Sequence, residues 1–230
     1  MNDNGPSSSV RDAVRSRQSV RAFLGDAVPT ETLREVLQDA ARAPSGGNLQ
    51  PWHVDVLTGE RLVALKTLMQ ARLASDAEPE TPEYDIYPPS LPAPWRDRRF
   101  RVGEGMYALL KIPREDKAAR RRWFANNYTF FGAPAAMICS VDRLMGPPQW
   151  SDLGMFLQTV MLLLRERGLD SCAQESWSIY PQTISRFLAW PESRMVFCGM
   201  AIGWRDPAHP VNALVTERAP LDEWARFHST

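Results

Sequence analysis

The chain has 230 residues, which is enough for one domain with a sizeable core. Its hydrophobic fraction of 44% and charged fraction of 23% are typical of a soluble globular domain. Lysine plus arginine and aspartate plus glutamate both total 27, which excludes a general electrostatic attraction to nucleic acid or to an anionic membrane. We therefore expect a single domain over residues 1–230 with neither of these partners.

The cysteines and histidines argue against a disulfide framework and against a local metal site. Cys139, Cys172 and Cys198 show no CxxC spacing, and the three histidines lie far apart in the sequence. An odd number of such cysteines is typical of reduced thiols. There is also no run of 18 apolar residues and no charged-then-apolar leader. The sequence therefore predicts a cytoplasmic protein without a bound metal.

The N-terminal part predicts a tail, two helices and a strand. Residues 1–9 are small and polar, and we expect them to be disordered. A short basic helix is expected from residue 10 to about residue 18. A second helix has Thr30 as its candidate N-cap and ends at Pro44, because one apolar stripe runs along it. Alternation over residues 52–59 then predicts a strand.

The middle of the chain is divided by a proline-rich segment. A helix is predicted over residues 60–73, before residues 79–94, which carry six prolines. Such a density of proline excludes regular secondary structure. The segment is either a surface loop or a cover over a site, and the sequence favours neither. Beyond it we predict a helix over residues 95–110 and another that opens at Pro113.

The C-terminal half contains the two most apolar runs. Residues 133–142 and 195–204 predict buried strands. Between them, residues 151–168 form a helix that is apolar nearly all round, and a short helix begins at Pro181. A tail rich in proline and charge follows, over residues 204–230. Helices and strands mix without βαβ regularity, which favours an α+β fold over a doubly wound sheet.

No motif for self-sufficient catalysis is present. The sequence contains no G-x-S-x-G elbow, H-E-x-x-H motif, Walker loop or dinucleotide-binding G-x-G-x-x-G. None of the histidines is placed to activate a serine or cysteine nucleophile. We therefore predict no catalytic side chain in the chain itself, and expect the reactive group to be borrowed from a cofactor.

One polar cluster suits an anionic ligand. The stretch "SRQSVR" places Arg17, Gln18, Ser19 and Arg21 at the end of the first predicted helix. Two guanidinium groups can fork onto phosphate oxygens, and the neighbouring amide and hydroxyl offer further hydrogen bonds. Taken alone, two arginines near a helix end more often cap helix carbonyls or face water.

Two further stretches suit a flat ligand that forms hydrogen bonds. In "PSGGN", at residues 44–48, the glycines allow close approach of the backbone, while Ser45 and Asn48 are directional partners. The alternative interpretation of this loop is a helix stop followed by a turn. In "CAQESW", at residues 172–177, a backbone amide can meet an acceptor atom of a ligand.

Five segments in order resemble one known family. They are "SRQSVRAF", "ARAPSGGNLQPWHV", "NNYTFFGAP", "DLGMFLQTVMLLLRERGLDSC" and "GMAIGWRDPAHPVNALVTERAPLDE". Together they resemble the FMN-dependent nitroreductase family, and in particular its nitroaromatic reductases, from about residue 11 to residue 228. The resemblance implies an α+β three-layer sandwich with a central, mainly antiparallel sheet flanked by helices. It also implies an intertwined homodimer with FMN at the subunit interface and a long tail that wraps the partner.

The resemblance also implies which residues bind FMN. They are Arg17, Gln18, Ser19, Arg21, Pro44, Ser45, Gly46, Asn48, Asn126, Asn127, Gln174, Glu175 and Arg218. The N-terminal motif and Arg218 would hold the phosphate, with Arg205 as a lesser candidate. The small-residue loop would reach the flavin across the dimer interface, and the main chain of Gln174 and Glu175 would face its reactive edge. Thr129 stands where relatives often carry a basic residue, which implies a different tuning of the reduced flavin.

The implied reaction is a ping-pong reduction. NADH or NADPH would reduce the flavin and leave, and a nitroaromatic acceptor would then be reduced to nitroso and hydroxylamino products. Aromatic residues that could form a slot for the acceptor, or serve only as core, are Tyr84, Trp95, Tyr128, Phe130 and Phe131. The alternatives are quinone or enone reduction, dehalogenation of halogenated aromatics or flavin destruction on the same scaffold. A flavin-binding protein without turnover and an interaction module without a cofactor are others.

Overall fold

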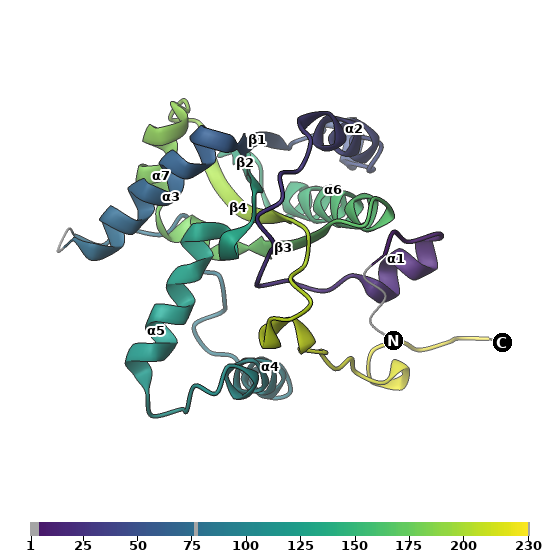
Figure 1. Ribbon diagram of the computed structural model, residues 1–230. Helices are drawn as coiled ribbons and strands as arrows, with labels where there is room; N and C mark the ends of the chain where they lie inside the picture. Colours follow the sequence, from purple (N-terminus) through teal and green to yellow (C-terminus); the bar gives the residue numbers. More distant parts are fainter. Residues whose placement is uncertain (1–4, 76–77, 230) are drawn as a thin grey trace.

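A four-stranded antiparallel sheet lies at the centre of the molecule, with helices on both of its faces (Figure 1). The computed structural model describes residues 5–75 and 78–229, so the part of the expected tail at residues 1–4 lies outside the described residues. The strand order is β1-β2-β4-β3. The strands span His53–Thr58 (β1), Ala135–Asp142 (β2), Asp170–Gln174 (β3) and Arg194–Gly203 (β4). The predicted α+β class and antiparallel sheet are confirmed.

The two runs that the sequence marked as buried strands form the middle of the sheet. β2 pairs with β1 on one side and with β4 on the other, and seven of its eight residues are buried. The edge strand β3 was not predicted, because Asp170, Ser171 and Gln174 conceal its alternation. It pairs with β4 in a register that runs from Asp170 opposite Gly203 to Gln174 opposite Gly199.

The helices form the two outer layers of the sandwich. α2 (Thr30–Ala40) and α6 (Pro147–Glu166) pack on one face, while α3 (Gly59–Ala74) and α7 (Pro181–Leu188) pack on the other. The second face also carries the short 3-10 segment Asn126–Gly132. The apolar stripe of α2 is directed inward, as its spacing predicts.

Several predicted helix boundaries were wrong. α1 covers Val10–Ser16 and stops before Gln18, while α2 stops at Ala40, short of Pro44. The residue before α2 is Pro29, so Thr30 is the first helical residue and not its N-cap. α5 covers Lys117–Ala125 and does not open at Pro113, because the carboxylate of its N-cap, Asp116, accepts the Ala119 amide at 2.8 Å.

Between β1 and β2 in chain order, two helices project from the body of the protein, and we call them the excursion. It consists of α4 (Trp95–Leu109) and α5, and neither helix contains a buried residue. The proline-rich segment leads into it and has no helix or strand over residues 78–94, as predicted. Within this segment Glu80 accepts the amides of Gln182 and Thr183 at the start of α7, which fixes its first half to the body of the protein.

Both chain ends lie against the rest of the molecule. Part of the tail that we expected to be disordered, residues 5–9, packs beside α6, where the Ser7 amide donates to the carbonyl of Arg165 at 2.9 Å. Over residues 204–229, the part of the C-terminal segment that the structure describes, the helical structure is limited to two short 3-10 turns, at Pro210–Ala213 and Leu221–Glu223. These ends together border the pocket that is described next.

Candidate functional site

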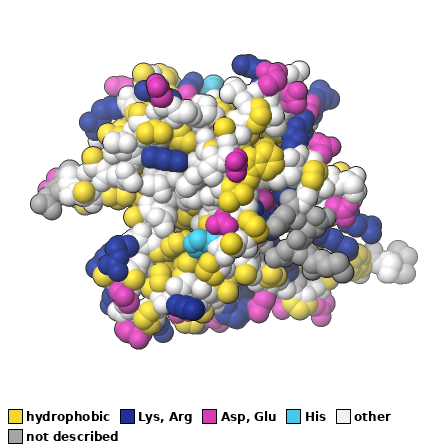
Figure 2. Space-filling view, in the orientation of Figure 1, with side chains coloured by type: hydrophobic (Ala, Val, Ile, Leu, Met, Phe, Trp, Pro, Cys, Tyr) yellow, Lys and Arg dark blue, Asp and Glu magenta, His cyan; other side chains and the backbone are white. Residues whose placement is uncertain are grey.

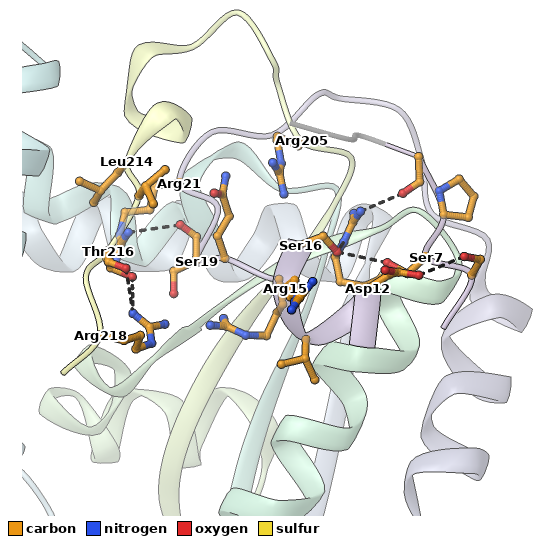
Figure 3. A pocket seen from close by; sticks show the side chains of 18 residues that line it. Ser7, Asp12, Arg15, Ser16, Ser19, Arg21, Arg205, Leu214, Thr216 and Arg218 are labelled. Carbon is orange, nitrogen blue, oxygen red and sulfur yellow. Dashed lines mark hydrogen bonds between the residues drawn. The ribbon is translucent and has the colours of Figure 1, made fainter. Parts of the chain in front are cut away.

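An open pocket of about 950 Å³ brings the two ends of the chain together. It is lined by residues from the N-terminal segment, by Arg165 and Arg205, and by residues 214–216 and Arg218. Figure 3 shows Arg21 and Arg218 approaching it from the two ends of the sequence. Among the predicted cofactor residues, the pocket collects Arg17, Gln18, Ser19, Arg21 and Arg218. Residues about 200 positions apart in the sequence thus share one surface.

The arginine-bearing segment is held in place by a sheet edge and by one asparagine. The Val20 amide donates to the Ser171 carbonyl of β3 at 3.1 Å. Asn212 accepts the Arg21 amide on its side chain at 2.9 Å, and the side chain of Gln18 donates to the Asn212 carbonyl at 2.8 Å. Asn212 was not predicted, since a single amide in a loop gives no sequence signal of this role.

The pocket is electropositive, and three of its arginines have no carboxylate partner within the described residues. Within the described part of the chain, Arg17, Arg21 and Arg218 form no ion pair with a carboxylate. Burial lowers the pKa of Arg17, and the positive charge of Arg218 lowers it further. Binding of an anion would relieve the repulsion between these positive charges. Guanidinium groups match the geometry of a phosphate, so the pocket is suited to a phosphate group.

Two other arginines of the pocket are already committed to a buried carboxylate. Arg205 holds Asp170 with two hydrogen bonds of 3.1 and 2.7 Å, and Arg165 approaches the same carboxylate at 3.3 Å. All three side chains are buried. Removal of one of these charges would leave its partner charge buried without compensation. The three residues therefore have a structural role in the wall of the pocket. Arg165 and Asp170 were not predicted as residues of the site.

A second group of predicted residues meets at the end of β3. The side-chain amide of Gln174 donates to the carbonyl of Asn127 at 2.8 Å and to its side-chain oxygen at 3.2 Å. Asn127, rather than Asn126, is therefore the asparagine that contacts Gln174. The Oε1 atom of Gln174 is buried and has no partner within the described residues. Such an acceptor fits a ligand that carries an N–H group.

The segment that carries Asn127 ends in a strained turn. Phe130, Phe131 and Gly132 follow one another at φ of 52°, 53° and 84°, which is costly for two bulky residues. The Phe130 ring stacks on Trp177 with centroids 4.4 Å apart, and this packing stabilises the conformation. Tyr128, Phe130 and Phe131 are all buried, so they serve as core and not as an acceptor slot.

The predicted small-residue loop lies apart from both groups. Pro44, Gly46 and Asn48 are exposed, and the loop does not line the arginine pocket. The Gly46 amide donates to both oxygens of the buried Asp152 at 3.3 Å, and Ser45 Oγ accepts the Gln50 amide at 3.0 Å. One chain therefore presents the arginine pocket, the Asn127–Gln174 pair and an exposed, well-anchored loop as three separate parts.

Comparison with known proteins identifies the family. The nitroreductase family model matches residues 14–204, most of the chain. The chain belongs to the nitroreductase family. It is 37% identical to a 4-nitrobenzoate reductase from Nocardioides sp. strain LMS-CY, over 93% of this chain and 87% of that relative. The family that the sequence resembled is thus confirmed.

Solved structures support the same assignment. One is the FMN- and NADPH-dependent nitroreductase NfnB from sphigopyxis sp. strain HMH, with a TM-score of 0.93 and 47% identity over 96% of this chain and all of that one. Another is the FMN-dependent NfnB from Mycobacterium smegmatis in complex with NADPH, with a TM-score of 0.88 and 30% identity, covering 95% and 97% of the two chains. The predicted nitroreductase-like sandwich is therefore confirmed.

Proposed function

We propose that this protein is an FMN-dependent oxidoreductase that uses NADH or NADPH to reduce nitroaromatic compounds to nitroso and hydroxylamino products. The observation that carries the proposal is the pocket in which uncompensated arginines from both chain ends converge. The names of its relatives, reductases of nitrobenzoate and nitrobenzene, support the choice of acceptor. NfnB, described as FMN- and NADPH-dependent, supports the choice of cofactors.

The residues of the chain fit FMN in two places. Arg17, Arg21 and Arg218 would hold the phosphate, and the unpartnered Oε1 of Gln174 would accept an N–H group of the ring. When bound, FMN supplies the hydride and electron transfer for which the chain has no side chain. The protein binds and orients the reactants. Two hydrogen bonds to Asn127 hold the side-chain amide of Gln174 in one orientation.

We also propose that the protein works as a homodimer in the cytoplasm, with the small-residue loop of one copy completing the site of the other. The loop is anchored but exposed, and Leu49 beside it is 54% exposed. Trp224 and Phe227 of the tail are 69% and 83% exposed, and Figure 2 shows hydrophobic side chains exposed among charged ones on the face in view. Surfaces of this kind mark interaction sites. Within the described residues, no helix is long and apolar enough to span a membrane.

The colour of the purified protein tests the proposed function. We expect a yellow protein whose visible absorption is bleached by NADH or NADPH without oxygen and restored by 4-nitrobenzoate. The product should be the hydroxylamino compound, which is separated by chromatography. A colourless protein that takes up no FMN would contradict the proposal. A yellow protein that NADH and NADPH do not bleach would instead be a flavin-binding protein without turnover.

Substitution of Gly46 tests the proposed role of the loop. In the single chain, a Cβ atom at Gly46 would meet only the Asp152 carboxylate, at 3.9 Å, and the backbone conformation there is an ordinary one. Gly46→Val should therefore leave the isolated fold intact but weaken dimer formation and FMN binding together. Light scattering and flavin stoichiometry measure the two effects.

The matched control for this experiment is Gly25→Val. Gly25 is another loop glycine, and a Cβ atom there would meet nothing within 4 Å. This variant should remain dimeric and fully loaded with FMN. If Gly46→Val behaves in the same way as the control, then the loop lies at neither the interface nor the flavin.

A further inference from the structure

The helix α4 of the excursion is held in place without burying any of its own side chains. None of its residues is buried, so its position depends on contacts at its surface. One face of the helix carries Arg98, Arg101 and Gly105, at relative positions i, i+3 and i+7, which share a face in any α-helix. This face meets the C-terminal segment that follows β4.

Three contacts join this face to the C-terminal segment. Arg98 pairs with Glu223 at 2.5 Å, and Arg101 pairs with Glu217 at 3.3 Å. Leu214 packs beside Gly105, and its Cδ1 would lie at an ordinary contact distance of 3.5 Å from a Cβ atom built there. As the helix positions fall from 105 to 98, the partners rise from 214 to 223, so the segment runs antiparallel along the helix.

The segment held in this way contains Arg218. Residues 214–220 belong to no helix or strand, so no backbone ladder fixes them. Among the residues that the structure describes, the Arg218 side chain donates only to its neighbours, Thr216 and the Glu217 carbonyl. The contacts with α4 therefore lie on both sides of an arginine that lines the pocket, and they set where its backbone lies.

We propose that Arg98, Arg101 and Gly105 of α4 form a clamp that positions Arg218 for the phosphate of the cofactor. The proposal deepens the proposed function and rests on it for the identity of the ligand. It assigns to α4 a part in holding the cofactor, although no residue of the clamp lines the pocket. Because the proline-rich segment leads directly into α4, movement of the excursion would be transmitted to the phosphate site.

Exchange of the two charges in the Arg98–Glu223 ion pair tests the clamp. Arg98→Glu places two acidic groups together, and we expect it to raise the dissociation constant of FMN by about three- to tenfold. Glu223→Arg should do the same, and the double variant should restore binding to nearly the parent value. The weakening in the single variants should shrink as salt is added, because both side chains are partly exposed. Fluorescence titration of the FMN-free protein measures the constant.

Arg96→Glu is the matched control. Arg96 lies on the same helix but pairs with its neighbour Asp97, so its reversal should leave FMN binding unchanged. Thermal unfolding of the FMN-free proteins shows whether a variant is merely less stable. Trypsin cleavage after Arg218, which needs no cofactor, should be faster in Arg98→Glu and slow again in the charge swap.

The outcomes separate the clamp from the proposed function. If the parent binds FMN and Arg98→Glu binds it equally well, the clamp is wrong and the proposed function stands. A weakened single variant that the swap does not restore also contradicts the clamp. If the parent binds no FMN, the proposed function fails, and the trypsin experiment alone decides whether α4 holds the segment around Arg218.

Discussion

Replacement of both Arg17 and Arg218 by alanine is expected to yield a folded protein that no longer retains FMN through purification. Each guanidinium would form charge-assisted hydrogen bonds to the phosphate, and the loss of one such partner costs roughly 1.5 to 3 kcal/mol. If the two losses add, affinity falls by more than about a hundredfold, since 1.4 kcal/mol is a factor of ten. Recovery of FMN fluorescence on dilution measures the dissociation of the cofactor.

The expected loss should be confined to the cofactor, because neither arginine supports the fold by an ion pair within the described residues. The FMN-free double variant should even unfold at a slightly higher temperature than the FMN-free parent, since the Arg17–Arg218 repulsion is removed. Arg11→Ala is the control, as Arg11 is an exposed arginine of α1 outside the pocket. FMN affinity that is unchanged in the double variant would show that the phosphate binds elsewhere.

The parts of the fold that the sequence predicted are those with strong local patterns. β2 and β4 are continuous apolar runs, and α2 and α6 carry the helical period, so their existence could be inferred from residue types alone. β3 could not be inferred, because its buried polar residues have partners that lie far away in the sequence. Asp170, for example, is compensated by Arg205.

The candidate site shows the same division. The spacing of Arg17 and Arg21 suggested an anion site, but only the fold shows that Arg218 joins them. The role of Asn212 depends on four hydrogen bonds, to Gln18, Arg21 and Ala22 in one distant segment and to the nearby Asp206, and no local pattern announces the distant ones. The strained turn at Phe130 and Phe131 contradicts residue preference altogether, because packing against Trp177 overrides it. For residues 79–94, a surface loop and a cover over the acceptor site are both still open interpretations.

Gly199→Ala is expected to be the most damaging single substitution of a glycine in the sheet. A Cβ atom at this position of β4 would lie 2.2 Å from Cδ1 and 2.6 Å from Nε1 of Trp177. Trp177 cannot move aside, because it is completely buried and its ring is stacked on Phe130. Overpacking of this kind costs about 3 kcal/mol, and for a domain of this size that lowers the melting temperature by roughly 6 to 12 °C.

The damage should also reach the cofactor site. Gly199 lies opposite Gln174 in the sheet, and Trp177 is three residues after Gln174 in the sequence. A displaced Trp177 ring would therefore move the Gln174 side-chain amide, whose Oε1 has no partner within the described residues. We expect Gly199→Ala to bind FMN more weakly even at temperatures where it is folded, as measured by fluorescence titration at 15 °C.

Gly103→Ala is the control, because it also adds a methyl group to a glycine but brings it against no other residue. Gly103 lies inside α4, where a Cβ atom would meet nothing within 4 Å, so alanine should stabilise that helix by about 0.5 to 1 kcal/mol. The two variants should therefore shift the melting temperature in opposite directions. A Gly199→Ala protein that melts together with the parent would mean that Trp177 does not occupy the space above Gly199. The packing that holds the strained turn, and with it the Asn127–Gln174 pair, would then need a different explanation.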